Sequence, residues 1–328
     1  MDDISTYIVK NLKKFDQRDN IFGRMKYDKN SDFYRIGIYD NVSDIVKKNK
    51  KGYSRFDFAK VMSSWTVYDY FHGSFSWDKL IEANSVMIKP NLGKISVKNN
   101  KSLSIKLKEV CKYFGATKVG ITDLNPLWVY SNDLDGNQIK IPEDCKYAIV
   151  IAIKMNPNLI KKSPNFIACA ETGLVYSRMA FCISCVAEYI RYLGYKAVPM
   201  GNDTALSIPL AIDAGLGELG RNGLLITKEY GPCVRLCKIF TNMPLKVDKP
   251  INLGVKDFCL NCRRCAEACE AGAIQFDKSP SFKIFSKSNS KGILRWAVDH
   301  EKCYKFWIEN GGDCSNCIAA CPYFPNNI

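Results

Sequence analysis

Histidine is nearly absent from this sequence. The 328 residues contain only His72 and His300, which excludes a histidine-rich metal site. No apolar run approaches the roughly 18 residues that cross a bilayer, and the longest, YAIVIAI over 147–153, has the length of a strand. The start, MDDISTYIVKNLKKFDQRD, lacks the apolar segment and the cleavage site of a secretory signal. We therefore expect a cytoplasmic protein, with peripheral membrane association only if a leader has been removed.

Cysteine, by contrast, is abundant. Fifteen cysteines are present, and eight of them fall in the final 70 residues. A chain of 328 residues can bury a large core without a disulfide scaffold. In a reducing compartment this many thiols indicates metal ligation together with buried apolar cysteine.

The charge is uneven along the chain. The formal net charge is +14, and +8 of it lies in residues 1–110. A solvated basic face is the simpler interpretation, and a docking surface for an acidic partner is the alternative.

From residue 102 onward the pattern predicts a mixed helix and strand core of about 150 residues. The segment SLSIKLKEVCKYFGA has helical spacing and stops near Gly115, and the run at 147–153 is typical of a strand buried on both faces. The predicted order is helix, strand, strand, helix, strand, over 102–115, 118–124, 147–153, 172–193 and 195–200. After Pro250 the composition changes abruptly. We expect an N-terminal region over 1–100 packing on the core, a core over 101–250, and a cysteine-rich domain over 251–328.

The cysteine spacing in this last domain is that of a two-cluster ferredoxin. One run is Cys259-x2-Cys262-x2-Cys265-x3-Cys269, and the second is Cys303 followed by Cys314-x2-Cys317-x3-Cys321-Pro322. The fourth cysteine of each such run ligates the other cluster. Cluster one should therefore be held by Cys259, Cys262, Cys265 and Cys321, and cluster two by Cys303, Cys314, Cys317 and Cys269.

Structural zinc is the alternative, but zinc sites favour paired CxxC knuckles over this run. Glu270 stands where the ferredoxin run has proline, and it adds negative charge beside a cluster. The other cysteines share no ligand spacing and are expected to be buried as small apolar residues: Cys111, Cys145, Cys169, Cys182, Cys185, Cys233 and Cys237.

Gly215, Gly217 and Gly220 match GxGxxG, but we do not expect a dinucleotide site here. That fingerprint needs a preceding strand, a following helix and an acid about 20 residues later, and this sequence offers none of the three. The close approach of the backbone to a large planar cofactor is the better explanation of the glycines. Two clusters pass single electrons to a redox group elsewhere in the chain. Because residues 100–250 show no second metal motif, a noncovalently bound flavin or corrinoid in this region is the natural candidate.

The chain resembles the corrinoid and iron–sulfur reductive dehalogenases. The resembling segments are FDQRDNIFGR, KEVCKYFGATKVGI, LNPLWVYS, the stretch from Ser207 to Leu245 that contains AGLGELGRNGLL, and CYKFWIENGGDCSNCIAACP. This resemblance implies an α+β protein, with a nitroreductase-like α/β corrinoid-binding core and a C-terminal ferredoxin-like domain holding two [4Fe-4S] clusters. It implies reductive cleavage of a carbon–halogen bond, with electrons relayed through the clusters to base-off cobalt.

Matching the family's site to this sequence gives three catalytic candidates. Tyr176 in ETGLVYSRM would be the proton donor, Asn202 in VPMGND the pocket asparagine, and Arg235 in YGPCVRL the basic residue beside the tyrosine. A carbon that has lost halide needs a proton, a phenol can donate one, and a guanidinium stabilises the phenolate that remains. Thr172 would share the face of Tyr176, and Trp307 is a candidate pocket wall. Corrinoid contacts are expected from Gly215, Gly217, Gly220, Arg221 and Asn222.

No protein ligand to cobalt is expected, because the DxHxxG pattern is absent around His72 and His300. The expected partners are a small halogenated organic substrate and an external low-potential electron donor of the ferredoxin or flavodoxin type. Nucleic acid is not expected, and a homodimer is allowed for. The alternatives are an enzyme like epoxyqueuosine reductase, which acts on tRNA, and a non-enzymatic electron-transfer or corrinoid-handling protein. The basic charge would suit RNA, but the abrupt end and the Tyr176, Asn202 and Arg235 set do not fit that enzyme.

Overall fold

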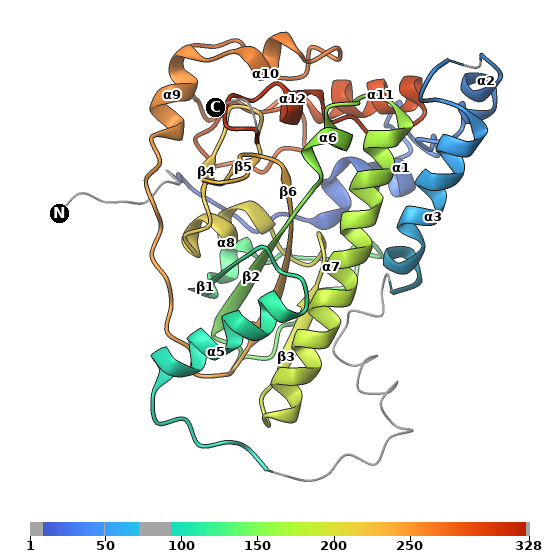
Figure 1. The fold of residues 1–328 in the computed structure, drawn as a ribbon. Coiled ribbons are helices and arrows are strands. Elements are labelled where there is room, and N and C mark those ends of the chain that lie inside the picture. The colour runs from blue at the N-terminus through green and yellow to red at the C-terminus, as the bar shows by residue number, and fades with distance from the viewer. Residues whose placement is uncertain (1–8, 49, 72–92, 326–328) are drawn as a thin grey trace.

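The computed structural model describes residues 9–48, 50–71 and 93–325, so His72 lies outside the described residues. A four-stranded antiparallel sheet forms the centre, in the order β1-β2-β6-β3. The strands are β1 (Lys118–Asp123), β2 (Tyr147–Lys154), β3 (Ala197–Met200) and β6 (Val234–Thr241), and a separate pair is formed by β4 (Glu218–Leu219) and β5 (Leu225–Ile226). The coarse prediction of mixed helix and sheet with a C-terminal iron–sulfur domain agrees with this architecture (Figure 1).

Helices cover both faces of the sheet. On one face, α5 (Asn100–Tyr113) and α7 (Phe166–Tyr192) bury their apolar residues against Ile149 and Ile151 of β2. On the other face, α8 (Ser207–Asp213) packs on Ala148 and Val150 of the same strand. Because β2 is buried on both sides and paired at both edges, its continuous apolar run at 147–153 is explained.

Local signals set the ends of these helices. The side chain of Asn99 accepts a hydrogen bond from the Ser102 backbone and starts α5, and Gly115 at φ +101° follows its end. Asn165 caps α7 in the same way, so this helix begins six residues before the predicted Thr172. By length and composition α7 could cross a membrane, as no other helix of the described ranges could, but 67% of its most apolar window is buried inside the molecule.

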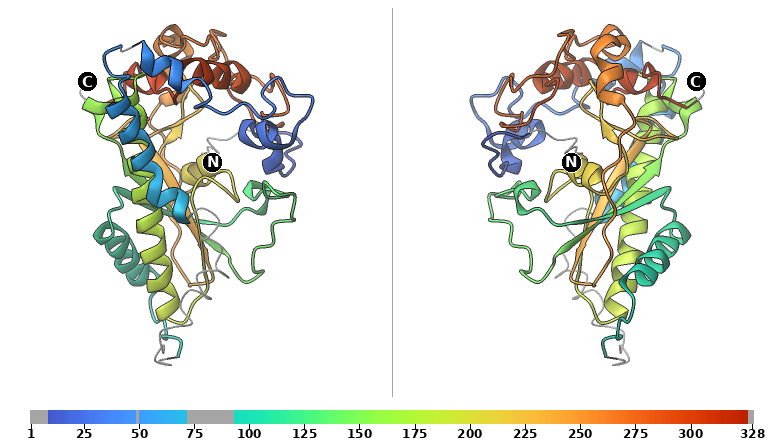
Figure 2. Two further views of the ribbon diagram at one scale, coloured as in Figure 1. Left: turned by 90° about the vertical axis from the view of Figure 1, so that its right-hand side faces the viewer. Right: turned by 90° about the vertical axis from the view of Figure 1, so that its left-hand side faces the viewer.

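The N-terminal segments lie against both other parts of the chain. They comprise η1 (Gln17–Asp19), α1 (Ile21–Tyr27), α2 (Val42–Lys47) and α3 (Arg55–Phe71). Figure 2 shows α3 running along α7, and the contacts between the two helices agree with that view. The short helix α6 (Pro157–Ile160) connects β2 to α7.

The C-terminal segment lies across one end of the sheet core. It consists of α9 (Val255–Asn261), α10 (Arg264–Glu267), α11 (His300–Asn310) and α12 (Asn316–Ala319), joined by long loops (Figures 1 and 2). α1 contacts α11, where the Phe22 and Tyr304 rings meet edge to face at 5.7 Å between centroids. This segment therefore packs on the N-terminal region as well as on the sheet.

All fifteen cysteines are free thiols. Of the seven expected to be buried outside the cluster runs, Cys185 is the exception, because it is half-buried on α7 whereas the other six are buried.

Candidate functional site: two thiol sets beside a cavity

The eight thiols of the two cysteine runs lie around two cavities, four at each. Cys259, Cys262, Cys265 and Cys321 line a small cavity together with Phe258 and Tyr323. Cys269, Cys303, Cys314 and Cys317 line a much larger one. The structure thus brings together the two crossed sets that the spacing predicts, each taking three thiols from one run and one from the other.

Short helices and backbone amides orient these thiols. In the second set, the Ala273 amide donates to the Cys269 Sγ at 3.3 Å, and the Asn316 amide donates to the Cys314 Sγ at 3.4 Å. The Ser163 hydroxyl, outside the domain, lies 3.8 Å from the Cys314 Sγ. Such donors stabilise a thiolate or a cluster sulfur.

The donor set fits an iron–sulfur cluster better than a zinc ion. Burial raises the pKa of the Cys265 thiol to about 12 and that of Cys321 to about 11, so a bound metal must favour their thiolates. Each cavity is lined by four cysteine thiols, the ligand set of a [4Fe-4S] cluster, and the run that supplies them is not the paired CxxC arrangement that structural zinc favours.

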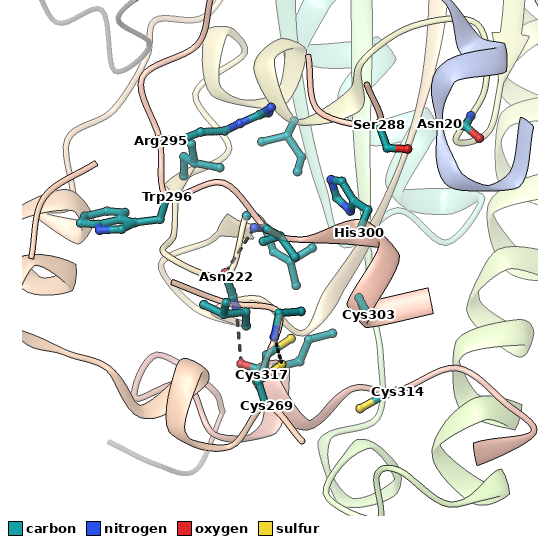
Figure 3. A pocket seen from close by; sticks show the side chains of 18 of the residues that line it. Asn20, Asn222, Cys269, Ser288, Arg295, Trp296, His300, Cys303, Cys314 and Cys317 are labelled. Atoms are coloured by element: carbon teal, nitrogen blue, oxygen red, sulfur yellow. Dashed lines mark hydrogen bonds between the residues drawn. The ribbon is translucent and has the colours of Figure 1, made fainter. Parts of the chain in front are cut away.

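The larger cavity has a volume of about 420 Å³ and lies between the sheet core and the C-terminal domain. Figure 3 shows the thiols of Cys303, Cys314 and Cys317 at one end and the His300 and Arg295 side chains farther along. Much of the remaining wall is apolar, including Leu206, Ile208, Leu224, Ile274 and Ile293. This volume is in the range that bound small molecules occupy.

Arg235 connects this cavity to the predicted proton donor. It lies on β6, lines the cavity, and donates from Nη2 to the Thr172 Oγ1 at 3.3 Å. Its guanidinium carbon lies 5.7 Å from the centre of the Tyr176 ring. The Arg235 Nε is buried without a hydrogen-bond partner among the described residues, so one donor remains available for a ligand.

Tyr176 itself is half-buried on α7 and is not among the residues that line the cavity. Its ring packs against Trp65 at 4.8 Å and against Tyr68 at 5.0 Å between centroids, and both belong to α3. The sequence analysis assigned no role to Trp65 or Tyr68. Their spacing of three residues on one helix face was the available signal.

Asn202 lines the cavity, and a buried lysine orders the loop that carries it. The Ser207 hydroxyl donates to the Asn202 Oδ1 at 3.3 Å and accepts from the Lys238 Nζ at 3.0 Å. Lys238 also donates to the backbone carbonyls of Gly201 and Asp203 at 2.8 and 2.9 Å. It has no exposed surface, and burial lowers its pKa to about 8. Sequence reasoning missed Lys238, although a single lysine inside the apolar run CKIF was a visible anomaly.

Of the five predicted corrinoid contacts, Asn222 lines the large cavity, whereas the glycines and Arg221 do not. A Cβ at Gly215 would meet the Lys249 carbonyl, and one at Gly217 would meet the Ile226 carbonyl. These glycines therefore permit close contact with the chain's own backbone.

The glycine segment has a helix before it, α8, and a strand after it, β5, which is the reverse of the dinucleotide fingerprint. Arg221 instead binds loops of the C-terminal domain. Trp307, the predicted pocket wall, lines the large cavity, and so does His300, to which the sequence analysis assigned no role.

Comparisons with known proteins agree with this geometry. Residues 258–324 match the family model described as 4Fe-4S dicluster domain. The tetrachloroethene reductive dehalogenase of Sulfurospirillum multivorans is 37% identical over 252 residues, covering 68% of this chain and 50% of that protein. A tetrachloroethene reductive dehalogenase of Desulfitobacterium hafniense is 35% identical over 293 residues, covering 76% of this chain and 53% of that protein.

The fold is shared more widely than the sequence. A solved catabolic reductive dehalogenase matches 98% of this chain and 44% of its own length, with a TM-score of 0.75 at 23% identity. The present chain spans about half the length of the curated relatives it matches.

Proposed function

The chain belongs to the reductive dehalogenase family, and we propose that it cleaves a carbon–halogen bond reductively with the help of a corrinoid and two [4Fe-4S] clusters. One observation carries the proposal: a single cavity is lined by four thiols of one cluster set and, on the sheet side, by Arg235 and Asn202. Such a cavity would place an electron source and candidate catalytic side chains around one cofactor. We also infer that the core is of the nitroreductase-like type, with the helices α5 and α7 on one face of the sheet.

The lining residues fit a corrinoid in their chemistry. A macrocycle with apolar edges and amide side groups needs apolar walls and a few polar donors. The cavity offers both, because the Arg235 Nε and the Trp307 Nε1 are buried there without partners among the described residues. When bound, the corrinoid would supply a low-valent cobalt to attack the carbon–halogen bond.

We expect the corrinoid to bind base-off and without a protein ligand to cobalt. His300 is the described histidine at this cavity, and burial, with repulsion from Arg295, lowers its pKa to about 4. It would therefore be a neutral polar contact. A His300→Ala variant should leave the base-off Co(II) EPR signal unchanged, and a changed axial-ligand signature would contradict this expectation.

Tyr176 would donate the proton that replaces the halogen. The Arg235 guanidinium, held by Thr172 beside the ring, would stabilise the phenolate that remains. Trp65 and Tyr68 would keep water away from this phenol and hold its ring in one orientation. Asn202, ordered through Ser207, would orient the substrate by hydrogen bonding.

The clusters would accept single electrons from an external low-potential carrier of the ferredoxin or flavodoxin type. Cluster two, held by Cys269, Cys303, Cys314 and Cys317, would be next to the cofactor because its thiols line the same cavity. Cluster one, held by Cys259, Cys262, Cys265 and Cys321, would precede it. The substrate class is a small halogenated organic compound.

The test is anaerobic reconstitution with iron, sulfide and cobalamin, followed by EPR and a halide-release assay with reduced viologen. We expect two cubane signals, a base-off Co(II) signal, and release of chloride or bromide from small halogenated alkenes or phenols. Tyr176→Phe should lower halide release by about 100-fold or more, in the range that general acids contribute, and Tyr192→Phe, an exposed tyrosine on the same helix, should not. Tight flavin binding with no corrinoid uptake would overturn the cofactor assignment.

A further inference from the structure

Arg221 is the largest fully buried side chain of the described residues, with 1% of its surface exposed. Its guanidinium donates only to backbone carbonyls. Nε lies 3.0 Å from the Cys262 oxygen, and Nη2 lies 2.6 Å from the Cys259 oxygen. Nη1 donates to the Gln275 and Asp277 oxygens at 2.9 and 2.8 Å. One core residue thus holds the end of α9 and a separate loop of the C-terminal domain.

These carbonyls satisfy the donors but do not neutralise the charge. Within the described ranges Arg221 forms no ion pair, and the ionisable groups that act on it most strongly are the thiols of Cys265, Cys259 and Cys262 and the guanidinium of Arg263. The guanidinium carbon of Arg221 lies 4.5 Å from the centroid of the Trp296 ring, whose face carries only a partial negative charge. Burial of a guanidinium without a counter-charge is strongly unfavourable, so native proteins pair such groups.

The nearest available counter-charge is the first thiol set. Arg221 lines the same small cavity as Cys259, Cys262, Cys265 and Cys321. When these thiols become thiolates around a [4Fe-4S] core, the site carries net negative charge, and reduction adds one more electron. A fixed positive charge that lines the same cavity favours the reduced, more negative state.

We propose that Arg221 is the built-in counter-ion of cluster one, and that its charge raises the reduction potential of this cluster while its hydrogen bonds fix the ligand loop. This inference rests on the cluster-one assignment of the proposed function, but not on dehalogenation or on corrinoid binding. Electron transfer here forms and breaks no bond: the external one-electron reductant is oxidised and cluster one is reduced.

The experiment is an anaerobic redox titration of the reconstituted full chain, followed by EPR, with iron content confirming that both clusters are loaded. Arg221→Gln removes the charge and keeps part of the hydrogen bonding. At a fixed ambient potential, the reduced-to-oxidised ratio of cluster one should fall about tenfold, which corresponds to a reduction potential lower by about 59 mV for one electron. The other cubane should change less than threefold.

Arg221→Lys separates charge from structure, because lysine keeps the charge but has fewer donors and no planar fork. In this variant the reduced-to-oxidised ratio of cluster one should stay within about threefold of the wild-type value. Arg191→Gln is the control: Arg191 of α7 pairs with Glu188, donates to the Ala197 carbonyl at 2.7 Å and lines neither thiol cavity, so neither potential should move.

Two results would overturn the proposal. One is an Arg221→Gln protein with both clusters loaded and both potentials unchanged. The other is an Arg221→Lys protein in which cluster one is loaded but its reduced-to-oxidised ratio is lowered tenfold, since the positive charge would then be irrelevant. If Arg221→Gln does not load cluster one, the Arg221→Lys variant decides the question. Failure of halide release leaves both titrations intact, so the proposed function and this inference fail separately.

Discussion

Lys238 allows the energetic cost of a buried charge in this core to be measured directly. The ammonium group has no exposed surface and satisfies its three donors with the Gly201 carbonyl, the Asp203 carbonyl and the Ser207 hydroxyl. Burial lowers its pKa from 10.5 to about 8. Between these two values the unfolded chain keeps the proton and the folded protein releases it.

The sign of the pH dependence follows from linkage. Where the unfolded state binds more protons than the folded state, the free energy of unfolding rises with pH. Each pKa unit corresponds to about 1.4 kcal/mol, so Lys238 adds up to about 3 kcal/mol of stability as the pH rises from about 8 to 10.5. Below pH 8 the lysine is charged in both states and adds no slope.

The perturbation is Lys238→Met, and the assay is urea unfolding of the anaerobic holoprotein at pH 7.5, 8.5 and 9.5. The difference in unfolding free energy between wild type and variant should shift in favour of the wild type by about 1–2 kcal/mol across this interval. Lys196→Met, at an exposed lysine that pairs with Asp144 at 3.0 Å, is the control and should show no such shift. If the difference in unfolding free energy between wild type and Lys238→Met stays constant within about 0.5 kcal/mol from pH 7.5 to 9.5, the reasoning is refuted.

The same variant has a functional consequence. Without Lys238 the hydrogen-bond chain through Ser207 to Asn202 loses its fixed end. In the halide-release assay we expect a several-fold increase in KM with a smaller effect on kcat, because substrate orientation changes while Tyr176 and Arg235 do not.

Three further substitutions test the fold. Gly217→Ala should lower the free energy of unfolding by about 1–3 kcal/mol in urea titrations, because its Cβ would meet the Ile226 carbonyl. Leu107→Ala, at a side chain 1% exposed on α5, should cost about 2–5 kcal/mol, whereas Ile105→Ala, 50% exposed on the same helix, should cost much less; equal losses would contradict the observed burial. Asn99→Ala should cost about 1 kcal/mol by removing the cap of α5, measured as a lower urea midpoint at an unchanged m value.

The parts of the fold that were predictable from sequence have local signals. The helix at 102–115 has apolar periodicity and a glycine at its end, and β2 is a continuous apolar run. β6 was missed, although it lies between β2 and β3 in the sheet. Its sequence VRLCKIFT contains Arg235 and Lys238, and these charges hide a central strand because their partners come from distant segments.

The site shows the same division. Cysteine spacing alone was enough to group the eight thiols into two crossed sets, because that spacing is set by the geometry of the cluster. The role of Arg221 could not be predicted, since four backbone carbonyls leave no mark in a sequence. The spacing of Trp65 and Tyr68 places them on one helix face, but their contact with Tyr176 could not be predicted, because it depends on the packing of α3 on α7.

The N-terminal region therefore has a structural role at both ends of the site. At one end Arg24 of α1 donates to the Ser288 hydroxyl at 3.2 Å and pairs with Glu301 of α11, the helix that carries Cys303. At the other end α3 supplies the aromatic contacts of Tyr176. Because one continuous segment touches the cluster helix and the proposed proton donor, loosening it should disturb cluster loading and proton donation together. These contacts give the N-terminal region a structural role that its charge does not indicate.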